Sequence, residues 1–212
     1  MTEPLFFDAD CISAFLWTKE QSILAKMYPG RIGIPRQTYE ELSAPTTPHL
    51  RKRIDQLIAD GQAQIVDIFT NTEAYSLYLK MTEAPAEGHR IIGRGEAACL
   101  ALAKMQNGTI ASNNLRDIRD YVTELGVDHI TTGDIMVNAY YAGLITEDQG
   151  NEIWASMLKK RRKIGAASFS EYLRSKATAQ LMAEIDRGWE SAEEGGWLTL
   201  EEVESQLGLT DA

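Results

Sequence analysis

Short apolar runs alternate with longer stretches of helical periodicity over the first two thirds of the chain. Runs rich in apolar and β-branched residues favour strands, whereas apolar positions spaced by three and four favour amphipathic helices. This alternation predicts an α/β fold in which one parallel sheet lies between helices. The predicted strands cover residues 5–7, 31–34, 64–69, 109–112 and 129–131. The predicted helices cover residues 12–27, 38–43, 50–60, 72–81, 96–106, 115–125 and 133–142.

The remainder of the chain has helical patterns only. A predicted helix over residues 148–163 ends in the basic run KKRRK, and Ser168 with Glu171 forms a capping box that begins the next helix. Thr199 and Glu202 repeat this pattern. The predicted organisation is an α/β domain over residues 1–147, a helical extension over residues 148–175, and an acidic helical hairpin over residues 176–212, with its turn at residues 193–197.

Acidic residues are concentrated at the C-terminal end. The formal net charge is −10, and residues 176–212 hold nine acids against two cations. The first 175 residues therefore carry only −3. An acidic protein is not expected to coat nucleic acid generally, because phosphate binding draws on basic surface. The uneven distribution weakens that objection for the α/β domain.

Few residues suit a disulfide or a zinc site. Cys11 and Cys99 lie in apolar stretches, which favours reduced core thiols. The three histidines lack the spacing of a zinc site. The first residues are acidic rather than basic, and no apolar run is long enough to cross a membrane. We therefore expect a soluble, cytoplasmic protein without a membrane partner, and any metal should be bound by oxygen.

Carboxylates follow the predicted strands. Asp8 comes directly after the apolar run LFF, and Asp10 is two residues further on. The strand ends of a parallel sheet share one edge, so acids that are distant in sequence are expected to meet there. The other candidates stand near the starts of later helices. They are Glu41, Glu96, Asp117 and Asp134.

Clustered carboxylates resist ionisation unless a cation neutralises them. Mg²⁺ or Mn²⁺ is the natural partner, because hard divalent ions prefer carboxylate and water oxygens. Such an ion can promote phosphodiester hydrolysis by stabilising the charge that develops during in-line displacement. A helix cap is the alternative interpretation for Glu96, Asp117 and Asp134. Asp8 favours a functional role most strongly, since a charge beside so apolar a strand is costly.

Five stretches, LFFDADCISAFL, IPRQTYEELS, GRGEAACLALA, ASNNLRDI and HITTGDIM, resemble the PIN-domain nucleases in order and spacing, including VapC-like toxin ribonucleases. The resemblance covers about the first 145 residues. It implies a PIN-like three-layer α/β/α fold with a parallel sheet of four or five strands, followed here by a C-terminal helical extension. It also implies Mg²⁺ or Mn²⁺ as cofactor and single-stranded RNA as substrate. The further implied partners are an antitoxin of a type II toxin–antitoxin system and a second copy in a homodimer.

The resemblance assigns roles to individual residues. Asp8, Glu41, Glu96 and Asp117 are the implied catalytic residues, and Asp8, Glu96, Asp117 and Asp134 the implied metal ligands. Family members often have an acid directly after the fourth strand, where this chain has Asn113 and Asn114. Asp117, one helical turn later, is predicted to replace it, and Asp134 to be the last ligand. Weaker substrate-binding candidates are Asp10, Ser112, Asn113 and Asn114.

Two other functions remain open. Asp8-Ala9-Asp10 is also similar to the D-x-D motif of haloacid-dehalogenase phosphatases, in which Asp8 would be the nucleophile. That interpretation leaves Glu41 and Glu96 without a role. Alternatively, Asn113 and Asn114 could mark a PIN-fold binding protein without catalytic activity. Weak Mn²⁺ binding would favour this third class.

Three further signals have plain structural interpretations. The glycines of GRG before Glu96 favour backbone freedom at a helix entrance over a phosphate-binding loop. The basic run 159–163 favours solvated helix surface over an RNA-binding segment. Trp189 and Trp197 favour a hairpin core over base stacking. Residues 176–212 are hypothesised to pack on the nuclease body or a partner, which would damp activity by occupying the substrate groove.

Overall fold

Five parallel strands form a single sheet in the order β3-β2-β1-β4-β5 in the computed structural model, which describes residues 3–85 and 87–207. The strands are β1 (Leu5–Phe7), β2 (Ile32–Pro35), β3 (Ala63–Val66), β4 (Thr109–Ala111) and β5 (Asp128–Ile130). All five predicted strands are therefore confirmed, with ends that differ by a few residues.

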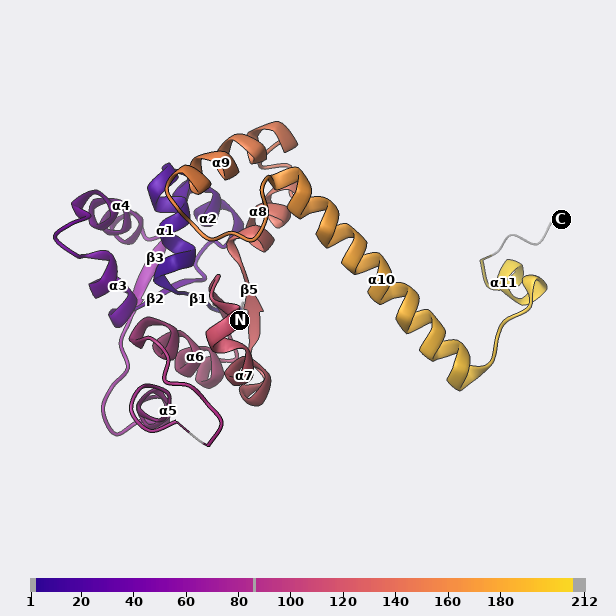
Figure 1. Cartoon of the computed structure of the whole chain (residues 1–212), viewed down its shortest axis with the longest axis horizontal. Helices are drawn as coiled ribbons and strands as arrows, with labels where there is room; N and C mark the ends of the chain where they lie inside the picture. The colour runs from indigo at the N-terminus through magenta and orange to yellow at the C-terminus, as the bar shows by residue number, and fades with distance from the viewer. Residues whose placement is uncertain (1–2, 86, 208–212) are drawn as a thin grey trace. The chain divides into compact units, whose positions relative to one another are not determined.

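Nine helices of the described chain surround or follow these strands before residue 160. They are α1 (Ala9–Thr18), α2 (Gln21–Met27), α3 (Arg36–Leu42), α4 (Pro48–Ala59), α5 (Glu73–Thr82), α6 (Arg94–Gln106), α7 (Leu115–Leu125), α8 (Thr132–Tyr141) and α9 (Glu147–Lys159). Helices α5, α6 and α7 lie on one side of the sheet, and α1, α2, α8 and α9 on the other (Figure 1). The α/β/α layers confirm the predicted fold class.

The strand order reverses beside β1. The chain first builds β1, β2 and β3 in one direction and then crosses to β4 and β5 on the other side of β1. Phe6 of β1 is in register with Gly33 of β2 and with Ile110 of β4. A parallel sheet leaves a crevice beyond the strand C-termini where its order reverses. The residues that follow β1 and β4 are therefore placed at the edge of one crevice.

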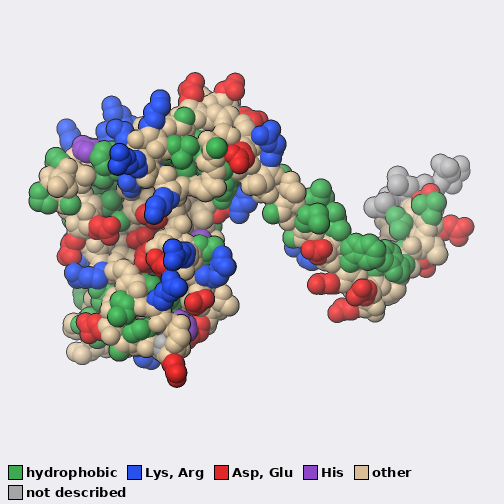
Figure 2. Space-filling view, viewed as in Figure 1, with side chains coloured by type: hydrophobic (Ala, Val, Ile, Leu, Met, Phe, Trp, Pro, Cys, Tyr) green, Lys and Arg blue, Asp and Glu red, His purple; other side chains and the backbone are tan. Residues whose placement is uncertain are grey.

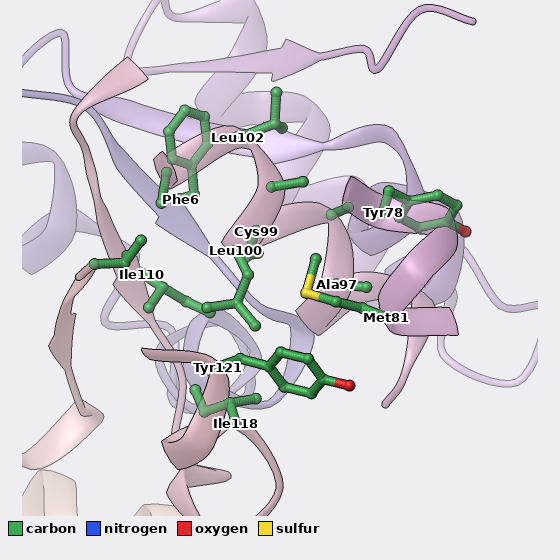
Figure 3. Close-up of a cluster of buried hydrophobic side chains, with 14 of the residues drawn as sticks. Phe6, Tyr78, Met81, Ala97, Cys99, Leu100, Leu102, Ile110, Ile118 and Tyr121 are labelled. Carbon is green, nitrogen blue, oxygen red and sulfur yellow. The ribbon is translucent and has the colours of Figure 1, made fainter. Parts of the chain in front are cut away.

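Helix α6 forms the core of one layer because its small and apolar residues are buried on nearly all sides. It packs against β1, β2 and β4 and is bordered by α3, α5 and α7. Figure 3 shows Leu100 of α6 close to Ile110 of the sheet, with Tyr121 and Ile118 of α7 below. This packing fixes the position of the start of α6, which carries Glu96.

The predicted continuous helix over residues 12–27 is wrong. Helix α1 ends at Thr18 because Lys19 adopts a left-handed conformation with φ of 68°, and its N–H reaches back to carbonyls of α1. The side chain of Arg53 also donates a hydrogen bond to the Leu16 carbonyl.

The predicted helix over residues 148–163 likewise ends early, at Lys159, so most of the basic run follows α9 rather than forming its surface.

The chain divides into two compact units after Ser170. Phe169 belongs to the first unit, is fully buried, and packs against Trp154 and Tyr140 with ring centroids 6.0 and 6.1 Å apart. A Cβ at Gly150 would overlap the Phe169 ring, so a residue with a side chain would not fit there. The unit thus includes the sheet together with α8 and α9.

The second unit contains most of α10 (Phe169–Gly195) and all of α11 (Leu200–Leu207). The capping box before α11 is confirmed, because the Thr199 N–H donates to Glu202 Oε2 at 2.7 Å and the Glu202 N–H donates to Thr199 Oγ1 at 3.3 Å. Trp189 and Trp197 touch edge to face with centroids 4.9 Å apart. Their exposed fractions are 55% and 67%, so the prediction that they form a hairpin core is wrong.

Candidate functional site

A cavity of about 750 Å³ opens beyond the C-terminal ends of β1 and β4. Acids from β1–α1, α3, α6 and α7 enter it, and a basic segment after α9 also borders it. We call it the acidic cavity. Its lining consists of Asp8, Asp10, Glu41, Gly93, Gly95, Glu96, Asn113, Asn114, Leu115, Arg116, Asp117, Arg161, Arg162 and Lys163.

Asp8 and Asp10 stand at the junction of β1 and α1. Asp8 is the N-cap residue of α1, its N–H donates to the Ala111 carbonyl at 2.9 Å, and only 5% of the residue is exposed. Ser112 Oγ donates to Asp8 Oδ2 at 3.4 Å. Asp10 Oδ1 accepts the Asn113 N–H at 3.2 Å. The end of β4 and the turn after it thus hold both acids in place.

Glu41 reaches the cavity from α3, and Gly95 leaves it room. Thr38 and Glu41 are three residues apart on α3 and so share one face. A Cβ at Gly95 would lie 2.9 Å from Asp8 Oδ1, 3.3 Å from Thr38 Oγ1 and 3.5 Å from Glu41 Oε2. The glycine therefore permits close approach of these oxygens, a role that the sequence interpretation of GRG missed.

Glu96 is held at the start of α6 by two different hydrogen bonds. Its Oε2 accepts the Gly93 N–H at 3.1 Å, which caps the helix, and its Oε1 accepts Asn114 Nδ2 at 2.6 Å. The same amide nitrogen donates to Asp117 Oδ2 at 2.8 Å. Glu96 therefore both caps α6 and contributes to the cavity. Asp117 lies beside it.

Burial and mutual repulsion disfavour ionisation in the acidic cavity. Burial raises the pKa of Asp8 well above its usual value, and the charges of Asp10 and Glu96 raise it further. Burial is also the main cause of the raised pKa values of Asp10, Glu41 and Glu96. Hydrogen bonds from Asn113 to Asp10 and from Asn114 to Glu96 oppose these shifts. Four neighbouring carboxyl groups with raised pKa values form a site that favours a cation.

Three predicted site residues have internal partners. Asp134 closes the capping box of α8, where its Oδ2 accepts the Thr131 N–H at 2.9 Å, and it is absent from the described lining of the cavity. The Asn113 side chain binds Thr132, with Oδ1 accepting its N–H and Nδ2 donating to its hydroxyl, both at 2.9 Å. Ser112 is fully buried beneath Asp8.

Cations border the same cavity. Arg161, Arg162 and Lys163 enter it from the segment after α9, and Arg116 from α7. Arg162 Nη1 donates to Ser13 Oγ at 3.1 Å, and its charge lowers the pKa of Asp10. The sequence interpretation of the basic run as solvated helix surface is wrong for these residues. Only the unusual density of five cations signalled another role.

The donor chemistry of the cavity fits a hard divalent cation. Within residues 3–85 and 87–207, no three acidic, histidine or cysteine side chains already stand close enough to enclose an ion. The Asn114 side-chain amide lies between Glu96 and Asp117, however, and donates a hydrogen bond to each of these carboxylates. Carboxylates with raised pKa values, with no thiol or imidazole among the described residues of the lining, suit a hard divalent cation.

The fold and cavity define an α/β protein with an acidic pocket at the point where the strand order reverses. A family model described as a PIN domain matches residues 5–178. The chain belongs to the PIN-domain family, whose members are generally nucleases that use divalent metal ions. No curated protein matches the chain. No helix within the described residues is long and apolar enough to cross a membrane.

Proposed function

We propose that this protein is a Mg²⁺- or Mn²⁺-dependent endoribonuclease that hydrolyses phosphodiester bonds of single-stranded RNA. The observation that carries the proposal is the convergence of Asp8, Asp10, Glu41, Glu96 and Asp117 on one cavity. These acids come from four separate parts of the chain. Capping of individual helices therefore does not explain why all of them meet in one cavity. Membership of the PIN-domain family supports nuclease chemistry.

Asp8, Glu96 and Asp117 would hold the metal ion, whereas Asp134 would keep its capping role. The bound ion would stabilise the charge that develops on the phosphate during displacement. Glu41, at the cavity mouth with a raised pKa, is positioned to accept or hold a proton. Arg161 and Lys163 would bind phosphate oxygens and offset the negative charge of the acids.

Cleavage of a labelled single-stranded RNA with and without Mn²⁺ tests the proposal. Glu96→Gln should lower the rate at least about 100-fold, because even residues that only orient metal ligands cost 10–100-fold when changed. Asp120→Asn is the matched control, since Asp120 lies exposed on α7 outside the cavity lining. Equal cleavage by the Glu96→Gln and Asp120→Asn variants would refute the assignment.

The phosphatase alternative predicts another result. Hydrolysis of a phosphate monoester through Asp8 would not require Glu96, so Glu96→Gln would retain that activity. The presence of Glu41 and Glu96 in the same cavity as Asp8 favours the nuclease, because that alternative gives them no role. Assaying p-nitrophenyl phosphate beside RNA separates the two, and the silent binding protein would cleave neither.

We also propose that the protein acts in the cytoplasm as the toxin of a type II toxin–antitoxin pair. The resemblance of its motifs to VapC-like toxins supports this role. Induced expression in a bacterial host should stop growth, and Glu96→Gln should relieve the arrest. Continued growth with the active protein, at matched expression, would contradict the toxin role without affecting the nuclease assignment.

A further inference from the structure

The basic segment after α9 borders two cavities. Arg161, Arg162 and Lys163 line the acidic cavity, whereas Lys160 lines a second cavity of about 450 Å³. We call the second one the Trp17 cavity. It lies between the end of α1, the start of α4 and the end of α9. Its lining consists of Trp17, Thr18, Lys19, His49, Arg53, Ser156 and Lys160.

The charge of the Trp17 cavity is positive. Lys19, Arg53 and Lys160 are cations, and none of the described residues that line the cavity is acidic. Figure 2 shows Lys and Arg side chains gathered on this part of the body, over α4 and α9, in a protein whose net charge is −10. A cluster of this kind against an acidic background marks a local anion-binding surface.

Aromatic rings form the other part of the Trp17 cavity. The Trp17 and His49 ring centroids are 4.4 Å apart at 64°, and Lys160 Nζ lies 5.4 Å from the Trp17 ring. Both rings are partly exposed. His49 Nε2 is shielded from solvent without a hydrogen-bond partner in the described part of the chain. Such an uncompensated polar atom is uncommon and calls for an explanation.

Helix capping explains part of this arrangement. Arg53 donates to the Leu16 carbonyl, and cations beside the C-terminus of α1 suit the helix dipole. Capping does not account for the cavity or for the paired rings of Trp17 and His49. Sites that bind single-stranded nucleic acids commonly combine cations with accessible aromatic rings. The cations contact phosphates, and bases stack on the rings.

We propose that the Trp17 cavity binds one nucleotide of the RNA strand whose phosphodiester bond is cleaved at the acidic cavity. This inference rests on the proposed function and adds a second contact along the substrate. Lys160 and Arg161 are consecutive residues, so one basic segment contributes to the linings of both cavities. The base must leave a duplex to stack on Trp17 or His49, and the site therefore selects single strands.

Fluorescence anisotropy with labelled RNA tests the inference independently of cleavage. The full chain carrying Glu96→Gln is used with a dinucleotide and with an octanucleotide. Adding Trp17→Leu should weaken octanucleotide binding at least about 5-fold, since stacking of one base contributes roughly 1–3 kcal/mol. Adding Lys160→Ala should weaken it as well, because the cation would no longer meet a phosphate. Dinucleotide binding should change less, because a dinucleotide in one cavity does not gain a second contact in the other.

Lys159→Ala is the matched control, because Lys159 is the exposed last residue of α9, directly before Lys160, and lines neither cavity. Lys160→Ala should also lower the salt dependence of octanucleotide binding by about 0.7 in the slope of log affinity against log salt. Equal effects of Lys159→Ala and Lys160→Ala, or equal binding of a duplex, would overturn the proposal. If the wild-type chain does not cleave RNA but Lys160→Ala still weakens octanucleotide binding, only the nuclease function is refuted.

Discussion

Asn114 donates a hydrogen bond of 2.6 Å from its side-chain amide to Oε1 of Glu96. The same nitrogen donates to Oδ2 of Asp117 at 2.8 Å, so one amide joins two carboxylates from different helices. An amide nitrogen carries two protons and can satisfy both acceptors. Asn114 therefore keeps two mutually repelling groups together without adding charge. This arrangement explains how an amide after β4 can stand among the acids of the cavity.

Replacing Asn114 by Asp should make the protein depend on metal for stability. The change removes both hydrogen bonds and adds a third carboxylate, so the metal-free protein should lose roughly 1–3 kcal/mol of unfolding free energy. Mn²⁺ should restore more of the melting temperature in this variant than in the wild type. Asn114→Ala is the control, since it removes the bridge without adding charge. An equal response of the two variants to Mn²⁺ would contradict the assigned bridge.

Asp8→Asn should stabilise the metal-free protein at neutral pH and abolish cleavage. The Asp8 pKa is raised in the folded state, so the folded protein binds a proton more tightly than the unfolded chain. Stability from this group is therefore present at low pH and falls as pH rises from about 4, the unfolded value, through the raised folded value. The asparagine variant should lack that fall in thermal melts recorded across pH. A steeper fall in the variant would show that the sign is wrong.

Gly95→Ala should weaken metal binding while leaving the fold in place. The added methyl group would lie 2.9 Å from Asp8 Oδ1, closer than ordinary contacts allow, so the carboxylate must move. Titration calorimetry with Mn²⁺ should show a loss of affinity of about 10-fold or more, the range seen when ligand orientation is disturbed. Gly188→Ala on exposed α10 meets no described atom within 4 Å and serves as the control.

Asp117 and Asp134 should differ in their effects. Asp117→Asn should lower Mn²⁺ affinity and RNA cleavage, because Asp117 lines the acidic cavity. Asp134→Ala should instead lower stability by about 1 kcal/mol through loss of the cap, with cleavage retained. Melting curves and cleavage rates measured on both variants separate a ligand from a cap. The reverse pattern would make Asp134 the ligand.

Removal of residues 179–212 should leave the first unit folded. The family match ends at residue 178, and the buried core formed by the sheet and α6 precedes it. The removed segment carries exposed apolar side chains on α10, including Leu181, Ile185 and Trp189, which favour association. The truncated chain should keep its melting temperature within a few degrees but change oligomeric state or cleavage rate. If both stay unchanged, the hypothesis that this segment packs on the body or a partner is wrong.

The sequence predicted the sheet well because its strands are short, apolar and separated by clear helical patterns. Asp8, Glu41 and Glu96 could be predicted as neighbours because each stands next to a strand end or helix start of a parallel sheet. The break at Lys19 could not be predicted, since a lysine in a left-handed conformation leaves no local signal. The entry of Arg161 into the cavity depends on where α9 ends and packs, which is a tertiary property.

Asn114 shows a different limit. Its sequence position suggested a depleted acidic site, whereas its side chain links two of the remaining acids. A residue list gives the number of carboxylates but not the hydrogen bonds among them. Likewise, Asp134 matched the expected ligand position and also matched a helix cap, and the sequence alone does not show which; the structure has the capping box.

We propose that the acids of the cavity hold a divalent cation together. Anomalous diffraction from crystals soaked in Mn²⁺ locates such an ion directly. We expect an anomalous peak within about 2.0–2.3 Å of carboxylate oxygens of Asp8 and Glu96, with Asp117 beside it. A peak elsewhere on the molecule, with the acidic cavity empty at millimolar Mn²⁺, would show that these acids do not bind the cation.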